Sequence, residues 1–254
     1  MNGTVGAGSR VAVVTGGASG MGLSIAERLA ARGNAVAVWD VDGEAAARAA
    51  DGLQSNGARA LGCAVDVSVR ADVDRAMTSV HTEFGPVGIM VTSAGIAAFA
   101  PFTEITEDAW NRMFAVNVTG TFHCLQAAIP DMVAAHWGRI VTIASSAGQI
   151  GSVRQAHYSA SKGAVIALTR TLSREYARDG ITVNTIPPSS IDTPMAREQQ
   201  ELGNLPAHEQ WAARIPVGRV GTGDDIAAAC AFLCSDEASY VTGQVFGVNG
   251  GAVP

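Results

Sequence analysis

The segment Arg10-Val-Ala-Val-Val-Thr-Gly-Gly-Ala-Ser-Gly-Met-Gly22 joins a short run of β-branched residues to a glycine-rich turn. Apolar residues at helical spacing follow it, namely Ile25 and Leu29, and the pattern stops at Gly33. A buried strand, a tight turn and an amphipathic helix are therefore expected in that order. This is the opening of a β-α-β unit, and it sets the interpretation of the remaining sequence.

The same alternation continues along the chain. Strands are expected at 10–15, 35–39, 58–65, 88–92, 139–143, 182–186 and 244–248, and helices at 20–31, 43–53, 70–84, 107–118, on to about 135, 157–177 and 224–233. Asp42 is well placed to cap the second helix. The pattern predicts an α/β fold, a doubly wound, Rossmann-like parallel sheet in a single domain spanning 10–254. Residues 1–9 read as a flexible tail, and about 188–217, at the carboxyl end of a strand, as a small lid insertion.

Composition excludes several classes of protein. The 254 residues are 48% hydrophobic and 16% charged, which argues against disorder, and the net charge of −6 argues against a nucleic-acid partner. No apolar run is long enough to cross a membrane, and the N-terminus does not resemble a signal peptide. The four cysteines fit small core residues in a reducing cytoplasm, and their surroundings suggest no metal site.

The turn after the first strand has the features of a phosphate-binding loop. Gly16, Gly20 and Gly22 let the backbone approach a pyrophosphate, and the next helix offers free N–H groups there. Asp40 ends the second strand, where its carboxylate can accept hydrogen bonds from a ribose diol. A helix cap is the alternative role for Asp40, but Asp42 suits it better. A carboxylate repels a 2′-phosphate and Ser19 is not basic, so NAD(H) is favoured over NADP(H).

The sequence His157-Tyr-Ser-Ala-Ser-Lys162 carries the chemistry. Tyr158 and Lys162 are four residues apart and share a helix face. A lysine ammonium beside a phenol favours the phenolate, which makes tyrosine a useful base near neutral pH. Ser145 ends the fifth strand and is expected at the same sheet edge. Alone, the pair could be a solvated helix face; beside a nucleotide-binding turn, a catalytic pair is the better interpretation.

Taken together, these motifs resemble the classical short-chain dehydrogenase/reductase family over residues 10–251. Asp66-Val67 matches the adenine-contact pair, Asn117 the helix asparagine, and Ile191-Asp-Thr193 the segment that holds the nicotinamide carboxamide. The resemblance implies a catalytic tetrad of Asn117, Ser145, Tyr158 and Lys162. It also implies cofactor contacts from Gly16, Ser19, Gly20, Met21, Gly22, Asp40, Asp66, Val67, Ser93, Ala94, Gly95, Tyr158, Lys162, Pro188, Ile191 and Thr193.

The resemblance also implies roles within the tetrad. Tyr158 exchanges a proton with the substrate oxygen, Lys162 lowers the Tyr158 pKa and bonds the nicotinamide ribose, Ser145 holds the substrate oxygen, and Asn117 anchors a water. Two positions depart from the family pattern: Ser93 replaces an asparagine and Ser189 a glycine. The stiff Pro187-Pro188 pair predicts that Ser189 keeps an ordinary negative φ and faces the substrate.

The expected reaction interconverts a small-molecule secondary alcohol and a ketone. Reduction of 3-oxoacyl thioesters is the enzymatic alternative, although the basic residues that would meet an acidic carrier protein are few. A non-catalytic scaffold is a lesser alternative, because the whole tetrad is present. Substrate contacts are expected from Ser145, Gln149, Gln155, Ser189 and Met195. The family resemblance further implies a homotetramer, with interfaces on 107–135, 157–177 and 243–254.

Overall fold

Six parallel strands form the central sheet, in the order β3-β2-β1-β4-β5-β6. The computed structural model describes residues 9–253. The strands are β1 (Val11–Thr15), β2 (Ala35–Asp40), β3 (Ala60–Ala64), β4 (Ile89–Thr92), β5 (Gly138–Ile143) and β6 (Ile181–Ile186). The predicted tail lies outside the described residues up to residue 8; Ser9 donates a hydrogen bond to Gly33 O, at 2.8 Å.

Helices alternate with the strands in sequence. The α-helices are α1 (Gly20–Ala31), α2 (Gly43–Ser55), α3 (Arg70–Phe84), α4 (Glu107–Phe114), α5 (Gly120–Ala135), α6 (Ala147–Ile150), α7 (Ala156–Glu175), α8 (Pro194–Glu201), α9 (His208–Ala212) and α10 (Gly223–Leu233). The shorter helical turns are η1 (Phe102–Glu104), η2 (Ala115–Thr119), η3 (Ala177–Asp179) and η4 (Asp236–Ala238). The π-helical η2 joins α4 directly to α5, so 107–135 is one continuous helical segment.

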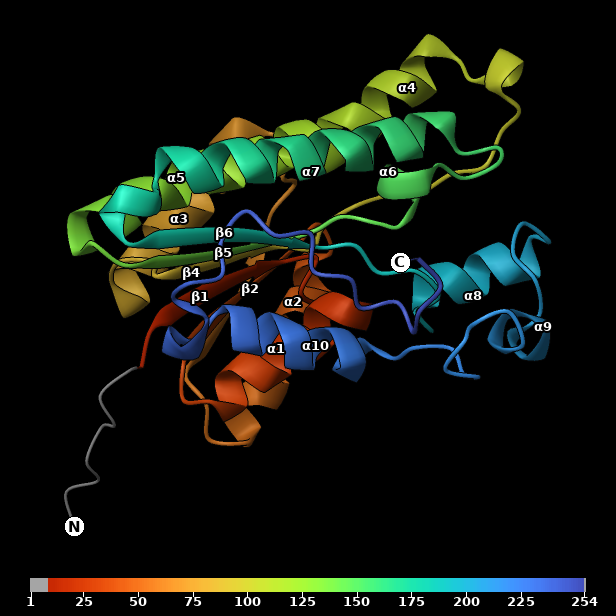
Figure 1. Cartoon of the computed structure of the whole chain (residues 1–254). Coiled ribbons are helices and arrows are strands. Elements are labelled where there is room, and N and C mark those ends of the chain that lie inside the picture. The colour runs from red at the N-terminus through yellow and green to blue at the C-terminus, as the bar shows by residue number, and fades with distance from the viewer. Residues whose placement is uncertain (1–8, 254) are drawn as a thin grey trace.

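Both faces of the sheet are buried, as continuous apolar strands require. Side chains alternate along β1, so Val14 packs toward α1, α2 and α10 while Val13 packs toward α3, α5 and α7. Figure 1 shows the two helical layers on opposite sides of the sheet. The predicted doubly wound α/β fold is confirmed.

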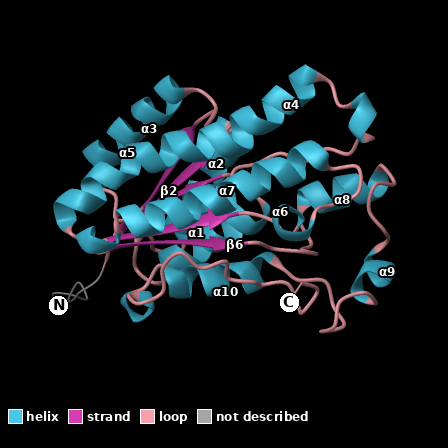
Figure 2. Cartoon of the chain, turned by 45° about the horizontal axis from the view of Figure 1, so that its top comes forward, coloured by secondary structure: helices cyan, strands magenta, loops and turns pink. Residues whose placement is uncertain are grey.

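The strand order reverses between β1 and β4, and this point positions the site. In open parallel sheets a crevice forms there, outside the carboxyl ends of the strands. The chain after β6 leads into α8 and α9, which extend beyond the end of the sheet in both views (Figures 1 and 2). The expected insertion therefore lies beside the crevice.

The predicted strand at 244–248 was wrong. Val245 makes only an isolated bridge to Thr185, because the chain turns at Gly243, where φ is +72°. The Asn184 side chain bonds the backbone on both sides of that turn: it accepts from Gln244 N and donates to Val241 O. Elsewhere the predicted elements agree to within a few residues, and Asp42 caps α2 by accepting from Ala45 N.

Candidate active site

The glycine turn after β1 has no room for a side chain at Gly16 or Gly22. A Cβ on Gly16 would lie 2.8 Å from Ala94 Cα, and one on Gly22 would lie 2.0 Å from Gly16 O. Gly16 and Gly20 also have positive φ, at +62° and +51°, which glycine adopts without strain. Ser19 precedes α1 and its side chain caps none of the helix N–H groups. The backbone at Gly16 and Gly22 thus carries no side chain where a diphosphate would lie.

The Asp40 carboxylate is fixed at the end of β2. One oxygen accepts from Ala18 N in the glycine turn and the other from Asp42 N, both at 3.2 Å. Asp40 therefore faces the turn, and Asp42 performs the helix capping. Val41, the next residue, is 71% exposed and carries no charge.

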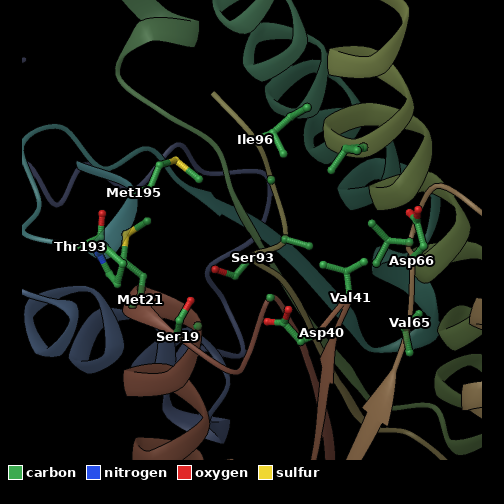
Figure 3. Close-up of a pocket in the computed structure, with 18 of the residues that line it drawn as sticks. Ser19, Met21, Asp40, Val41, Val65, Asp66, Ser93, Ile96, Thr193 and Met195 are labelled. Carbon is green, nitrogen blue, oxygen red and sulfur yellow. The ribbon is translucent and has the colours of Figure 1, made fainter. Parts of the chain in front are cut away.

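A cleft of about 260 Å³ runs between these groups. In Figure 3, Asp66 and Val65 lie on one side of it, Thr193 and Met195 on the other, and Asp40 between them. Of the expected cofactor residues, the cleft contains Gly16, Ser19, Gly20, Met21, Gly22, Asp40, Asp66, Val67, Ser93, Ala94, Gly95 and Thr193. Val41, Val65, Ile96, Arg112, Val116 and Pro194 also line it and were not predicted, since no motif reports how closely α4 and the loop after β4 approach it.

The loop after β4 is held by Thr15 at the end of β1. Thr15 Oγ1 accepts from both Ser93 N and Ala94 N, at 3.1 Å each. These contacts use only the backbone of Ser93, so replacement of the family's asparagine leaves this anchor intact.

Asn117 lies in the π-helical turn and is almost fully buried. Its Oδ1 accepts from Ile96 N, and its Nδ2 donates to Ile96 O and Ser161 Oγ, at 2.9 to 3.0 Å. Nδ2 also lies 3.1 Å from Met113 Sδ. The side chain therefore ties the loop after β4 to α7. Its expected role as a water anchor stays a prediction.

Lys162 is buried beside Asn117. A Cβ on Gly95 would lie 3.3 Å from Lys162 Nζ and 3.2 Å from Asn117 Oδ1, so a larger residue there would press on both side chains. Lys162 Nζ donates to Ile143 O at 2.9 Å and lies 5.9 Å from the centre of the Tyr158 ring. Burial lowers the pKa of Lys162 to about 8.

Tyr158 and Ser145 meet at the carboxyl end of β5. Burial raises the pKa of the Tyr158 phenol above its ordinary value, and a hydrogen bond with the Ser145 side chain opposes that rise. Lys162 Nζ donates to the Ile143 carbonyl and lies near the Tyr158 ring, and the expected lowering of the Tyr158 pKa by its charge stays a prediction. Ser145 is the neighbour whose hydrogen bond favours the phenolate.

A second cleft of about 340 Å³ opens in front of Tyr158 and Ser145. It contains Gln155, Pro188, Ser189, Ile191 and Met195 as well as Gln199, Leu205 and Trp211 from the segment after β6. It shares three residues with the first cleft, so the two adjoin: Met21, Thr193 and Met195.

Two expectations for the substrate side have different outcomes. Gln149 is exposed and does not line the second cleft, because it lies on the outer side of the short helix α6. Ser189 lines the cleft with an ordinary φ: among described non-glycine residues only His136 and Arg154 have positive φ. The predicted absence of a positive φ at Ser189 is confirmed, its attribution to the proline pair stays a prediction, and Ser146 N donates to Pro188 O at 2.8 Å.

Two further observations concern other kinds of site. No helix within residues 9–253 is long and apolar enough to cross a membrane. Among the same residues, no three histidine, cysteine or acidic side chains gather in a way that could hold a metal ion.

Comparison with known proteins agrees with this geometry. A family model described as enoyl-(acyl carrier protein) reductase matches residues 16–253. The chain is 41% identical over 246 residues to 2-(S)-hydroxypropyl-CoM dehydrogenase 3 of Xanthobacter autotrophicus, covering 96% of each chain. It is 38% identical to the 3-oxoacyl-[acyl-carrier-protein] reductase FabG of Salmonella typhimurium, covering 95% of this chain and 96% of that one.

A solved structure gives the same result. The crystal structure of gox2181 superposes with a TM-score of 0.92 and 35% sequence identity, over 97% of this chain and 96% of that one. The fold, the glycine turn and these similarities lead to one conclusion: the chain belongs to the classical short-chain dehydrogenase/reductase family.

Proposed function

We propose that this oxidoreductase interconverts a secondary alcohol and a ketone with NAD(H), using Tyr158 as the acid and base. The observation that carries the proposal is the junction of the two clefts. Tyr158 and Ser145 line one, the glycine turn and Asp40 line the other, and the two meet at Met21, Thr193 and Met195.

The residues of the first cleft fit a dinucleotide. The bare backbone at Gly16 and Gly22 suits the diphosphate, and the fixed Asp40 carboxylate suits a ribose diol. Thr193 Oγ1 accepts from Ala196 N and still has its proton to donate to the nicotinamide carboxamide. When bound, the nicotinamide ring supplies the hydride or accepts it.

The protein's own part is to move a proton and hold an oxygen. In reduction, Tyr158 gives its hydroxyl proton to the carbonyl oxygen as the carbon receives hydride; in oxidation it takes that proton back. Ser145 donates to the same oxygen and stabilises its developing charge. Lys162 holds the ribose and, with a pKa lowered by burial to about 8, supplies the replacement proton. Asn117 positions the loop and α7 around this group.

Preference for NAD(H) follows from charge at the ribose end. Asp40 is acidic, Val41 is neutral, and Ser19 is neutral. Arg112 is the one cation among the described residues that line the first cleft, and its guanidinium lies 3.9 Å from the Asp66 carboxylate. A 2′-phosphate beside Asp40 would therefore meet repulsion without compensation.

The relatives leave the substrate open. Their names refer to a CoM conjugate, an acyl carrier protein and, for a 41% identical enzyme of Sinomonas cyclohexanicum, cis-4-hydroxycyclohexanecarboxylate. We favour a free small molecule over an acyl carrier protein. Just before β5, where reductases of acyl-carrier substrates typically present basic side chains, this chain has His136 and Trp137. The Trp137 ring is stacked by Arg10 and Arg139 and its N–H donates to Asp236.

Assembly as a homotetramer is the remaining part of the proposal. Phe122 on α5 and Phe246 near the C-terminus are 45% and 37% exposed, and Tyr240 is fully exposed. These aromatic side chains lie in or beside the segments expected at the interfaces, and contact with further copies would bury them.

The test of the activity is a panel of secondary alcohols and ketones. Each is assayed by NADH absorbance, with NADPH in parallel at equal concentration. We expect turnover with NADH and slower turnover with NADPH. Absence of cofactor oxidation or reduction with every member, despite NADH binding, would count against the proposal.

A further inference from the structure

Gln199 presents a hydrogen-bond donor to the second cleft. It lies on α8, lines the cleft and is only 9% exposed. Its Oε1 accepts from Asn204 Nδ2 at 2.9 Å, while its Nε2 has no hydrogen-bond partner among the described residues. A substrate that displaces water from this N–H must supply an acceptor in its place, because a donor left without a partner is costly.

Contacts with two neighbouring side chains favour this orientation of the Gln199 amide. Arg154 can only donate, and its guanidinium contacts Asn204 Oδ1 at 3.5 Å. Asn204 therefore turns its Nδ2 toward Gln199, and Gln199 must turn its Oε1 toward Asn204. The Nε2 of Gln199 is what remains for the cleft.

The backbone holds Arg154, the first of these three side chains, in place. Arg154 has φ of +61°, a conformation rare for a residue with a side chain, and its carbonyl accepts from Ala100 N at 2.8 Å. Gln155 follows, is 7% exposed, lines the same cleft, and does not cap α7 with its side chain. Two largely buried glutamines, Gln155 and Gln199, thus line the cleft that contains Tyr158.

No charge balances an ionic substrate in this cleft. Its described lining contains no Asp, Glu, Lys or Arg. Arg197 on α8 is paired with Asp192 through two hydrogen bonds of 2.7 and 2.8 Å, and Arg154 lies outside the lining. An anionic group taken into this space would lose its hydration without a partner.

We propose that the substrate is an uncharged ketone or secondary alcohol that carries a second oxygen, which accepts a hydrogen bond from Gln199 Nε2. This rests on the proposed function, because the reacting oxygen is the one held by Tyr158 and Ser145. An ester, a thioester or a second ketone all supply such an acceptor. Gln199 is then a specificity residue of the lid.

The test compares matched ketones. One set is the ethyl esters of oxo acids with one, two or three methylene groups between the two carbonyls. The controls are alkanones of equal length, the free carboxylates, and the corresponding N-acetylcysteamine thioesters. We expect the best ester or thioester to exceed its alkanone by about tenfold in kcat/KM, since the site would leave Nε2 unpaired with the alkanone. The carboxylate should be the poorest, and the ester and thioester arms distinguish free from carrier-like substrates.

Variants assign the preference to Gln199. Gln199→Leu should bring the ester-to-alkanone ratio close to one. Gln200→Ala is the matched control: this neighbour bonds Pro206 O within the lid, so its loss tests loosening alone. Asn204→Asp keeps the shape but offers only acceptors, so Gln199 should rotate and present its oxygen, favouring hydroxyketones over ketoesters.

Several results would overturn the inference. They are equal ratios for ester and alkanone, equal losses in the Gln199 and Gln200 variants, or a carboxylate as the best substrate. For panel members that are not turned over, protection of the enzyme–NADH complex against thermal unfolding is measured, and ester protection no greater than alkanone protection is also negative. A failure of the proposed function gives a different result: the esters bind selectively, but no ketone of the panel leads to oxidation of NADH.

Discussion

Lys162 is the single lysine of the chain, and its charge is buried. Burial lowers its pKa from an ordinary 10.5 to about 8. At pH values below 8, holding the ammonium in the folded protein therefore costs about 3 kcal/mol, at ~1.4 kcal/mol per pKa unit. Lys162→Met keeps a linear side chain of similar size and removes that cost.

The expected gain in stability of Lys162→Met is smaller than the full cost of burying the ammonium. The variant leaves Ile143 O without the 2.9 Å bond from Nζ, a loss of about 1 to 2 kcal/mol. At pH 7 the cofactor-free Lys162→Met protein should thus be more stable than wild type by about 1 to 2 kcal/mol. It should also be inactive, since the tetrad has lost its cation.

The pH dependence gives the sharper test. Between pH 8 and 10.5 the unfolded chain binds more protons at Lys162 than the folded protein does, so wild-type stability rises with pH across this window. The advantage of Lys162→Met is therefore full below pH 8 and disappears as pH rises toward 10. Urea unfolding followed by circular dichroism at several pH values measures both proteins.

A direct measurement accompanies the unfolding series. In protein labelled with ¹³C-lysine, the side-chain resonances come from one residue, so an NMR titration reports the Lys162 pKa alone. A value near 10.5, or a stability difference that does not change between pH 7 and 10, would refute the reasoning.

Three other predictions follow from the site. Asp40→Ala combined with Val41→Arg should shift the ratio of kcat/KM for NADH and NADPH toward NADPH; faster turnover of NADPH than of NADH by the wild type would show that Asp40 does not select NAD(H). Ser189→Gly should raise KM for the substrate without raising the melting temperature, because Ser189 has no left-handed strain to relieve; a higher melting temperature with unchanged KM would remove it from substrate binding. Light scattering at micromolar concentration should give a tetramer, with Phe122 and Phe246 covered, whereas a monomer would contradict the assembly.

The fold was accessible from sequence because its signals are local. The strand and helix periods, the positive-φ glycines at 16 and 20, and the Asp42 cap all depend on residues within a few positions of each other. The strand expected at 244–248 failed because Asn184, about 60 residues away, supplies side-chain bonds in place of the ladder.

The site was only partly accessible for the same reason. Motifs indicated Ser145, Tyr158 and Lys162, but the aim of the Lys162 ammonium at Ile143 O depends on how α7 packs on β5. Gln199 carries no sequence signal at all. Its polarity comes from Asn204 and Arg154, which the fold brings together across 50 residues.

The most direct test of the account is Tyr158→Phe, assayed with the best ketone of the panel. The variant keeps the ring and removes the proton donor, so kcat should fall by about 10² to 10⁴. NADH affinity should stay within about twofold, since the glycine turn and Asp40 are untouched. Tyr176→Phe, at the end of the same helical segment and outside both clefts, is the matched control and should turn over like wild type. Near-normal turnover by Tyr158→Phe would contradict the assignment of Tyr158 as the acid and base.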